Sequence, residues 1–331
     1  MTAASLRVSA RAALLLLTLA VGAWWVQPAP SLAVTVTDAA GDTVEVEDLS
    51  RIISIGGDVT EILYALDKQD QIIAVDTTSQ YPAKVLDEKD DVGYMRALSA
   101  EGVLSMNPSV IIASAGSGPP EVVKLLKSSS VPYVEVPDET SPEAVADKVR
   151  FVAEVVGEQE AGEKIAKSVE DDFALLAELR EKIETPQRAL FILSVGDGKA
   201  SVAGTGTGAD AIIKLAGAEN AAEMLTGYKP VVNESAIELA PDAIITMQHG
   251  GPSSNSLEKI KAVKGMEMTP AVKNNRVISM DGLYLLGFGP RASKAARDLM
   301  AKLYPELDIP PSEGHETAHH KAEAQDADAA Q

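Results

Sequence analysis

The feature that most constrains the fold is a long amphipathic helix that the sequence predicts for residues 158–184, near the middle of the chain. Apolar side chains recur in it at spacings of three and four, and the positions between them are largely charged, which is typical of a helix that packs on one face. The apolar positions are Ile165, Val169, Phe173, Leu176, Leu179 and Ile183. At a rise of about 1.5 Å per residue, the helix would span on the order of 40 Å before Pro186 ends it. We interpret it as a rigid spine between two other parts of the chain.

Strand-like and helix-like segments alternate before this spine. Residues 34–38 and 43–47 alternate apolar and polar side chains around a Gly-Asp turn, a pattern that predicts a β-hairpin. Short apolar runs typical of buried strands follow at 51–55, 71–75, 110–113 and 133–136. A Gly-Gly pair after the first of these runs allows a tight turn into a helix predicted at 60–66. The first half therefore reads as a parallel-sheet α/β unit.

The same pattern resumes in the second half. Buried strands are predicted at 189–195, 243–246 and 276–280, and helices at 142–156, 209–216 and 290–304. The whole chain is thus predicted to have an α/β fold with two Rossmann-like lobes, each with a central and mostly parallel sheet. The lobes would comprise residues 34–141 and 187–308, joined by a helical linker at 142–186. Residues 309–331 are rich in Ala, Glu, Asp and His, so we expect a disordered tail.

The first 33 residues are predicted to be a secretory signal peptide. Two arginines precede an apolar run at 12–26 that is short for a membrane span, and small residues stand at Ser31 and Ala33, as at a cleavage site. An uncleaved anchor helix fits less well because two prolines follow the apolar run. The chain has no cysteine, so neither a lipidated cysteine nor a disulfide can form. We expect cleavage after Ala33 and a free, not lipid-anchored, periplasmic protein.

The strong negative charge narrows the choice of partners. The formal net charge is -20 at pH 7, and the predicted signal peptide contributes only positive charge. A strongly acidic body argues against nucleic acid or an anionic membrane surface as the partner. It suits docking on a basic protein surface instead.

A tyrosine and an arginine lie two residues apart at Tyr94 and Arg96, shortly before the predicted strand at 110–113. A phenolate is a hard oxygen donor that suits ferric iron, and tyrosine is one of the few side chains that ligate haem iron. The guanidinium of Arg96 can hold a haem propionate by a bidentate, charge-assisted hydrogen bond. On these two residues alone, an ordinary loop tyrosine beside an exposed arginine fits as well.

The two halves also share a local repeat. Glu101 stands seven residues before Pro108 in EGVLSMNPSVII, and Glu234 stands seven residues before Pro241 in ESAIELAPDAII. In both segments a helical turn carries the glutamate at its start, and the proline leads into a predicted buried strand. The match indicates duplicated lobes with one acidic residue on each equivalent surface.

These segments together resemble a known family. The chain is similar to the periplasmic haemin-binding proteins of ABC importers, in the bilobal, helical-spine class that also includes cobalamin- and siderophore-binding proteins, over about residues 34–306. The matching segments are IISIGGDVTEILYAL, VGYMRALSAEGVLSMNPSVIIAS with GPPE, AGTGTGADAIIKLAG, GYKPVVNESAIELAPDAI and LYLLGFGPR. GYMRALSAEG is the most discriminating for haem, because the siderophore and cobalamin relatives share the architecture but not that tyrosine.

The resemblance implies a function and a role for each of these residues. It implies a carrier that captures ferric haem in a cleft between the lobes, with Tyr94 as the axial iron ligand and Arg96 beside it. Glu101 and Glu234 match paired glutamates that engage arginines on an inner-membrane ABC permease, which works with its own ATPase. We expect a monomer that binds haem as cargo and is not an enzyme.

Three other residues are weaker candidates for the ligand cleft. Tyr228, in a Gly-Tyr-Lys-Pro turn, can face the cleft from the C-terminal lobe, and Tyr284 is a lesser version of the same idea. His249, which follows a predicted buried strand, can reach the second side of the iron, although a lone histidine is more often structural. Residues 194–198 lack the second axial histidine that some family members carry, which puts a second haem of that kind in doubt.

Two alternatives remain open at this point. The first is an iron-siderophore or cobalamin carrier of the same fold class, in which Tyr94 only lines the pocket. The second is a periplasmic hydrolase or haem-degrading enzyme, which has little support because the chain lacks a nucleophile-elbow motif, a zinc-binding histidine pair and cysteine.

Overall fold

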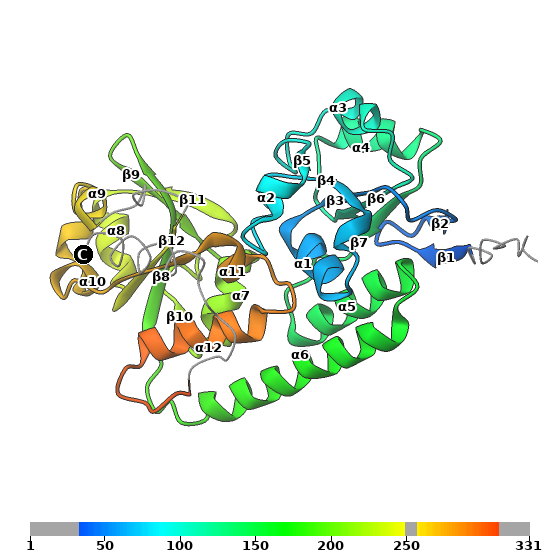
Figure 1. Cartoon of the computed structure of the whole chain (residues 1–331). Helices are drawn as coiled ribbons and strands as arrows, with labels where there is room; N and C mark the ends of the chain where they lie inside the picture. The colour runs from blue at the N-terminus through cyan, green and yellow to red at the C-terminus, as the bar shows by residue number, and fades with distance from the viewer. Residues whose placement is uncertain (1–32, 249–256, 311–331) are drawn as a thin grey trace, which may run out of the picture. The chain divides into compact units, whose positions relative to one another are not determined.

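A computed structural model of the chain describes residues 33–248 and 257–310. The predicted signal peptide and most of the predicted tail lie outside these residues, and so does His249. Among the described helices, none combines the length and the apolar character that a bilayer crossing requires. We call the elements up to β7 (Tyr133–Val136) the N-terminal lobe and those from β8 (Arg188–Gly196) onward the C-terminal lobe (Figure 1).

The N-terminal lobe contains a parallel sheet whose central strands are largely apolar. Its order is β5 (Asp90–Asp91), β4 (Ile72–Val75), β3 (Ile52–Ile55), β6 (Val110–Ser114) and β7. Every neighbouring pair is parallel, and β3 and β6 are buried at every position. Helices cover both faces of a parallel sheet, which explains why these strands read as continuous apolar runs. The predicted hairpin also forms, as β1 (Val34–Thr37) and β2 (Thr43–Val46) in antiparallel register.

Alternate side chains of this sheet enter two different apolar clusters, as the twofold repeat of a strand requires. The helices of the lobe are α1 (Gly57–Ala65), α2 (Val85–Glu88), α3 (Ala100–Ser105), α4 (Pro120–Lys127) and a 3₁₀ turn at Gln69–Gln71. Ile52 and Ile112 pack with α1 on one face, whereas Ile53 and Ile111 pack with α3 and α4 on the other. Figure 1 shows these helices on opposite faces of the sheet.

The C-terminal lobe contains a mixed sheet. Its order is β11 (Tyr228–Val231), β9 (Lys199–Ala203), β8, β12 (Ala243–Gln248) and β13 (Val277–Asp281), and β10 (Glu219–Asn220) also pairs with β8. The pairs β8–β10, β8–β12 and β12–β13 are parallel, which agrees with the predicted mostly parallel sheet. The pairs β8–β9 and β9–β11 are antiparallel. Strand β11 is the edge strand, and it places Pro230 opposite Ser201.

The two antiparallel strands were not expected from the sequence. The turn between β8 and β9 is Asp197-Gly198, and both residues have positive φ, at 50° and 70°. Asp-Gly with two positive φ angles is the favoured turn of a two-residue hairpin, because its twist matches the twist of the strands. The signal was therefore present, but Lys199–Ala203 is too short and too polar at its start to stand out as a strand.

Helices cover both faces of this second sheet. They are α7 (Gly208–Leu215), α8 (Asn233–Leu239), α9 (Leu257–Lys261), α10 (Pro270–Lys273), α11 (Gly282–Leu286), α12 (Ala292–Leu303) and a 3₁₀ turn at Met266–Met268. Phe191 of β8 packs in the cluster that contains α7 and α12, while Leu190 and Ile192 pack with α8, α9 and α10.

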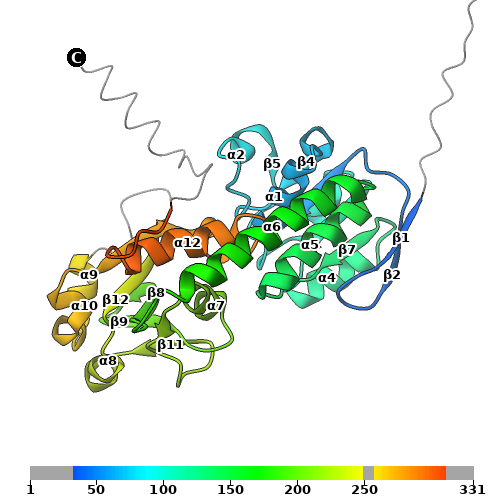
Figure 2. The same cartoon turned by 90° about the horizontal axis from the view of Figure 1, so that it is seen from below.

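Two consecutive helices link the lobes. Helix α5 (Pro142–Val155) agrees with the prediction to within one residue, and α6 (Gln159–Arg180) occupies most of the predicted spine. Its 22 residues correspond to about 33 Å. The helix is shorter than predicted because its last four expected residues form turns. Helix α6 packs on α5 and on α12, as Figures 1 and 2 both show.

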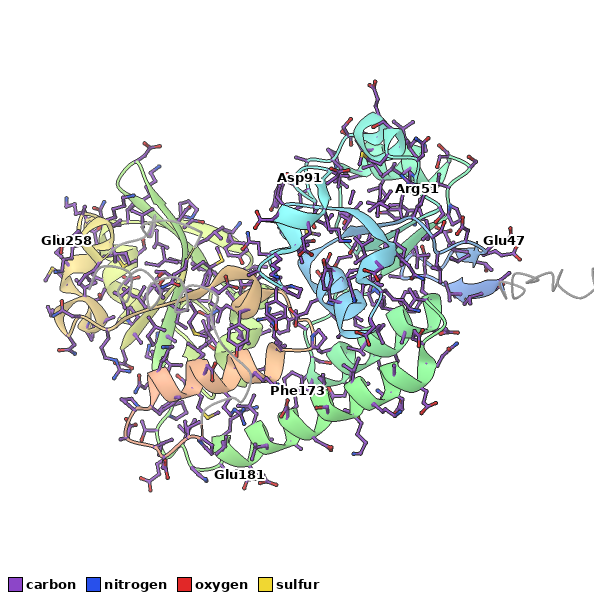
Figure 3. All side chains as sticks on the ribbon, viewed as in Figure 1. Glu47, Arg51, Asp91, Phe173, Glu181 and Glu258 are labelled. Carbon is purple, nitrogen blue, oxygen red and sulfur yellow. The ribbon has the colours of Figure 1, made fainter. Side chains whose placement is uncertain are left out.

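The contacts of α6 come from the predicted apolar positions. Phe173, labelled in Figure 3, is 6% exposed, and Val169 and Leu176 are also buried. Where α6 passes α5, a side chain at Gly162 would overlap the Cβ of Ala153. Only glycine therefore allows the two helices to approach this closely.

A buried charged lysine ties α5 to the N-terminal sheet. Lys148 of α5 is 1% exposed, and its Nζ lies 2.6 Å from Oδ2 of Asp58 and 3.1 Å from Oδ1 of Asp138. Burial alone would lower the pKa of Lys148, but the two carboxylates raise it above its ordinary value. Ser114 of β6 donates a further hydrogen bond to the Asp58 carboxylate at 3.2 Å. The group is thus a paired and hydrogen-bonded buried charge, as such groups must be.

We predict that Lys148→Met destabilises the fold by roughly 3–5 kcal/mol, because it leaves the Asp58 carboxylate buried without its cation. Urea unfolding followed by circular dichroism measures this loss. Lys167→Met, which removes an exposed ion pair within α6, is the control and should change the free energy of unfolding little. Equal effects of the two substitutions would contradict a structural role for the buried group.

Candidate ligand-binding site

The segment that carries Tyr94 leaves the N-terminal sheet at the carboxyl end of β5. Asp91, the last residue of that strand and labelled in Figure 3, accepts a hydrogen bond from the backbone N–H of Gly93 at 2.7 Å. Gly93 has a φ of 92°, which a side chain would make unfavourable. Its carbonyl accepts from the N–H of Thr77 at 3.0 Å, which fixes the segment beside the end of β4. In open α/β sheets, ligands bind beyond the carboxyl ends of the strands.

Buried and exposed side chains alternate along this segment. Met95 and Leu98 lie in the apolar cluster that packs with α3 and α4. The N–H of Leu98 donates a hydrogen bond to the carbonyl of Gly118, and the N–H of Gly118 donates to the carbonyl of Met95. Tyr94 and Arg96 remain at the surface. The Tyr94 side chain is 44% exposed. The apolar anchors thus hold the two polar side chains on one outward face.

The two polar side chains contact each other directly. Arg96 Nη1 donates a hydrogen bond to the Tyr94 phenol oxygen at 3.0 Å. The guanidinium of Arg96 therefore lies directly at the phenol oxygen of Tyr94.

Tyr228 of the C-terminal lobe interacts electrostatically with Arg96. It is the first residue of β11 and is 39% exposed. Burial raises the pKa of its phenol, and the positive charge of Arg96 lowers that pKa in part. The charge of Arg96 therefore reaches across to the C-terminal lobe. Tyr228 thus lies within electrostatic range of Arg96, which itself bonds to Tyr94, and with its raised pKa Tyr228 stays a neutral phenol that can donate a hydrogen bond.

An acidic side chain balances Arg96 on its other side. Asp138, which binds the buried Lys148, is close enough to Arg96 for their charges to attract. The charges of Arg96, Asp138, Lys148 and Asp58 thus alternate in sign from the surface inward. Arg96 therefore has one hydrogen-bond partner among these groups, the Tyr94 phenol, and a longer-range attraction to the Asp138 carboxylate.

The remaining candidates lie elsewhere. Tyr284 in α11 is 3% exposed, and its hydroxyl donates to Oδ2 of Asp298 at 2.9 Å. It lines a separate pocket of about 330 Å³ together with Glu61, Tyr81 and Arg291, among others. His249 directly follows β12 but lies outside the described residues.

The two predicted docking glutamates occupy equivalent positions. Glu101 is the second residue of α3, and Glu234 is the second residue of α8, and both side chains are exposed. After each helix a proline stands two residues before a buried strand, Pro108 before β6 and Pro241 before β12. The repeat seen in the sequence therefore corresponds to the same helix–proline–strand unit in each lobe.

The sequence did not point to Glu61 and Arg291 as a pair. They form an ion pair between the lobes at 2.8 Å. Arg291 lies in the segment LYLLGFGPR, which carried the family resemblance, but nothing in the sequence named its partner 230 positions away.

The fold agrees with the comparisons to known proteins. A family model described as "Periplasmic binding protein" matches residues 52–283, which is more than half of the chain. The chain therefore belongs to the periplasmic binding protein family. Members of this family, and the similar solved structures described next, are substrate-binding transport proteins. A periplasmic location follows from this membership.

Two solved structures of haem-binding proteins are similar to this chain. The periplasmic heme-binding protein RhuT from Roseiflexus sp. RS-1, in its apo form, has 35% sequence identity and a TM-score of 0.74, covering 78% of this chain and 99% of that chain. The periplasmic heme-binding protein BhuT, in complex with two hemes, has 34% identity and a TM-score of 0.72, covering 77% and 98%. The predicted α/β fold is confirmed by these similarities.

Curated relatives are more distant and more varied. The ABC transporter substrate-binding lipoprotein YvrC of Bacillus subtilis is 28% identical over 280 residues, which is 82% of this chain and 86% of its own length. The vitamin B12-binding protein of Vibrio parahaemolyticus is 25% identical over 255 residues, which is 76% of this chain and 89% of its own length.

We predict that Arg96→Met raises the pKa of Tyr228 further above its ordinary value near 10, because the substitution removes the cation that lowers it while burial persists. A titration of ¹³Cζ-labelled tyrosine followed by NMR measures the change. Tyr304, whose pKa burial raises without a contribution from Arg96, is the control and should titrate as before. An unchanged Tyr228 titration would show that Arg96 does not reach it.

Proposed function

We propose that this protein captures ferric haem between its lobes and delivers it to an ABC importer in the inner membrane. The observation that carries the proposal is the exposed Tyr94 phenol with the Arg96 guanidinium bonded to its oxygen. Tyr228 of the other lobe, whose pKa the charge of Arg96 lowers in part, completes the group formed by Tyr94, Arg96 and Tyr228. The haem-binding proteins RhuT and BhuT, which share the fold, support the choice of cargo.

In this proposal each member of the group has a separate role. Tyr94 supplies the axial oxygen to Fe(III), which favours the deprotonated phenol. Arg96 stabilises the charge on that oxygen or turns to a propionate, since a guanidinium suits either anion. Tyr228, kept neutral by its raised pKa, donates a hydrogen bond to the porphyrin edge or a propionate. We do not assign Tyr284 to the cargo, because its hydroxyl is bonded to Asp298.

Delivery would use the glutamates on the outer surfaces of the lobes. Glu101 and Glu234 present one carboxylate per lobe from equivalent helices, which suits a permease with two equivalent basic positions. Such charge pairs set encounter rate and register more than affinity. The protein would act as a monomer released to the periplasm by cleavage after Ala33, and its cargo would leave unaltered.

A second candidate cargo is cobalamin, because curated B12-binding proteins are among the relatives of this chain. In cyanocobalamin both axial positions of the cobalt are already filled, by cyanide and by the attached benzimidazole, so the cobalt does not need a phenolate ligand. A cobalamin carrier would therefore leave Tyr94 without its proposed task. Titration of the protein with cyanocobalamin and with haemin, each followed by absorption, distinguishes the two cargoes directly.

We predict that the protein binds haemin with a high-spin ferric spectrum and a tyrosinate charge-transfer band, and that Tyr94→Phe removes this band. The affinity should fall at least about tenfold, since even the outer partners of metal ligands contribute that much. Absorption titration measures both effects. Tyr64→Phe removes a phenol from the separate pocket and should leave spectrum and affinity intact. An unchanged spectrum in Tyr94→Phe would rule out the proposed ligation.

We also predict that Glu101→Gln combined with Glu234→Gln slows haem transport while haemin binding stays as in the wild type. The loss should diminish in high salt, because docking charges act mainly on association. Uptake into proteoliposomes that contain the cognate importer measures it. Glu121→Gln with Glu238→Gln, which neutralises one exposed glutamate in each lobe, is the matched control. If the first pair of substitutions abolished haemin binding, the docking role would be wrong.

A further inference from the structure

The lobes meet directly at an ion pair that lies apart from the linker helices. Glu61 belongs to α1 of the N-terminal lobe, and Arg291 immediately precedes α12 of the C-terminal lobe. Arg291 Nη2 lies 2.8 Å from Glu61 Oε2, and the backbone N–H of Arg291 donates to Glu61 Oε1 at 3.2 Å. The two side chains are only 7% and 15% exposed. One glutamate thus holds both the side chain and the backbone of the arginine.

Aromatic rings complete the enclosure of this arginine. The guanidinium carbon lies 3.5 Å from the centroid of the Tyr81 ring and 5.1 Å from that of Tyr284. Burial would lower the pKa of Arg291, but Glu61 raises it above its ordinary value. A stacked, planar guanidinium that is paired with a carboxylate has little freedom to move.

The backbones of the two lobes also approach closely beside this pair. A side chain at Gly57, in the first turn of α1, would meet Cδ1 of Leu283 in α11 at 2.5 Å. One at Gly289 would meet Cα of Asp58 at 3.5 Å and Cδ of Glu61 at 3.4 Å. The lack of a side chain at Gly57 therefore leaves room for Leu283 of α11, and Gly289 is in ordinary contact distance of α1.

This contact lies at the same edge of the N-terminal sheet as the proposed ligand site. Helix α1 begins just beyond the carboxyl end of β3, and the Tyr94 segment begins just beyond the carboxyl end of β5 in the same parallel sheet. Carboxyl ends of parallel strands share one edge of a sheet, so the contact and the Tyr94 segment are on the same edge. Any change in the contact would change where the C-terminal lobe, with Tyr228, stands relative to Tyr94.

We propose that Glu61, Arg291 and Tyr81 form a clamp that fixes the spacing of the lobes before the cargo arrives. Glu61 and Arg291 would be positioning residues: they hold Tyr228 opposite Tyr94 and contact no cargo. The expected effect of the clamp on haem binding rests on the proposed function. Its effect on the spacing of the lobes does not. A cleft that is set in advance loses less conformational freedom when its ligand binds.

Loss of the clamp has a defined consequence for affinity. If lobes without it occupy the binding-competent spacing only about a tenth of the time, the apparent affinity for haemin falls about tenfold. The spectrum of bound haemin should not change, because Tyr94 and Arg96 remain. This combination separates a positioning role from ligation, which changes the spectrum.

The test compares the wild type with the double variant Glu61→Gln, Arg291→Met. The double variant avoids an unpaired buried charge, which single substitution would leave. Because the chain contains no cysteine, Lys124→Cys in α4 and Glu238→Cys in α8, both exposed, take spin labels at these two positions only. Double electron–electron resonance then gives the distance distribution between the lobes with and without haemin. Glu160→Gln with Lys164→Met, which removes an exposed ion pair of α6, is the control.

We expect a narrow distribution in the wild type and the control that haemin does not change. In the double variant we expect a broad distribution that narrows with haemin, together with about tenfold weaker binding and an unaltered bound spectrum. If the folded double variant kept the narrow distribution, the clamp would be refuted. If the double variant failed to fold, the same distance measurement on Tyr81→Ala, which keeps both charges, would decide. A broader interlobe distance distribution in Tyr81→Ala would support the clamp, and an unchanged distribution would refute it. Failure of the wild type to bind haemin would refute the proposed function and leave the distance result valid.

Discussion

The packing of α6 against helices of both lobes is the interaction on which the rest of the structure depends. One apolar face of this helix meets α5, which belongs with the N-terminal sheet, and α12, which covers the C-terminal sheet. A continuous helix cannot bend sharply without breaking hydrogen bonds. Helix α6 is therefore a stiff connection between the two sheets, and it limits how far side chains at the edge of one sheet can move relative to side chains at the edge of the other. The group formed by Tyr94, Arg96 and Tyr228 depends on this.

Much of the fold could be predicted because burial and periodicity are local properties of the sequence. Strands β3, β6 and β8 are apolar runs buried in parallel sheets, and α5 and α6 show the spacing of an amphipathic helix. Strand β11 could not be recognised, because three of its four residues are exposed and one is a proline. Its pairing depends on β9, and thus on a turn elsewhere in the chain.

The site could be predicted where one short segment carries the chemistry, and not where distant segments meet. Tyr94 and Arg96 are two residues apart, so a single motif names them, and their hydrogen bond follows from that spacing. Tyr228 could be assigned to the same site only through the resemblance of the chain to a known family. Glu61 and Arg291 have no local pattern at all, because their relation exists only once the lobes have folded. Tyr284 shows the opposite case: its motif suggested the cleft, whereas its hydroxyl bonds to Asp298 within its own lobe.

Pro230 in the edge strand β11 affects how readily the sheet can pair with a strand of another molecule. The outer side of an edge strand offers backbone groups that can pair with another molecule, and such pairing starts aggregation. A proline has no N–H to donate, and it tolerates edge positions for that reason. Two exposed neighbours, Tyr228 and Lys229, add bulk and charge on the same short strand. The C-terminal sheet therefore ends in a strand that resists extension by a further strand.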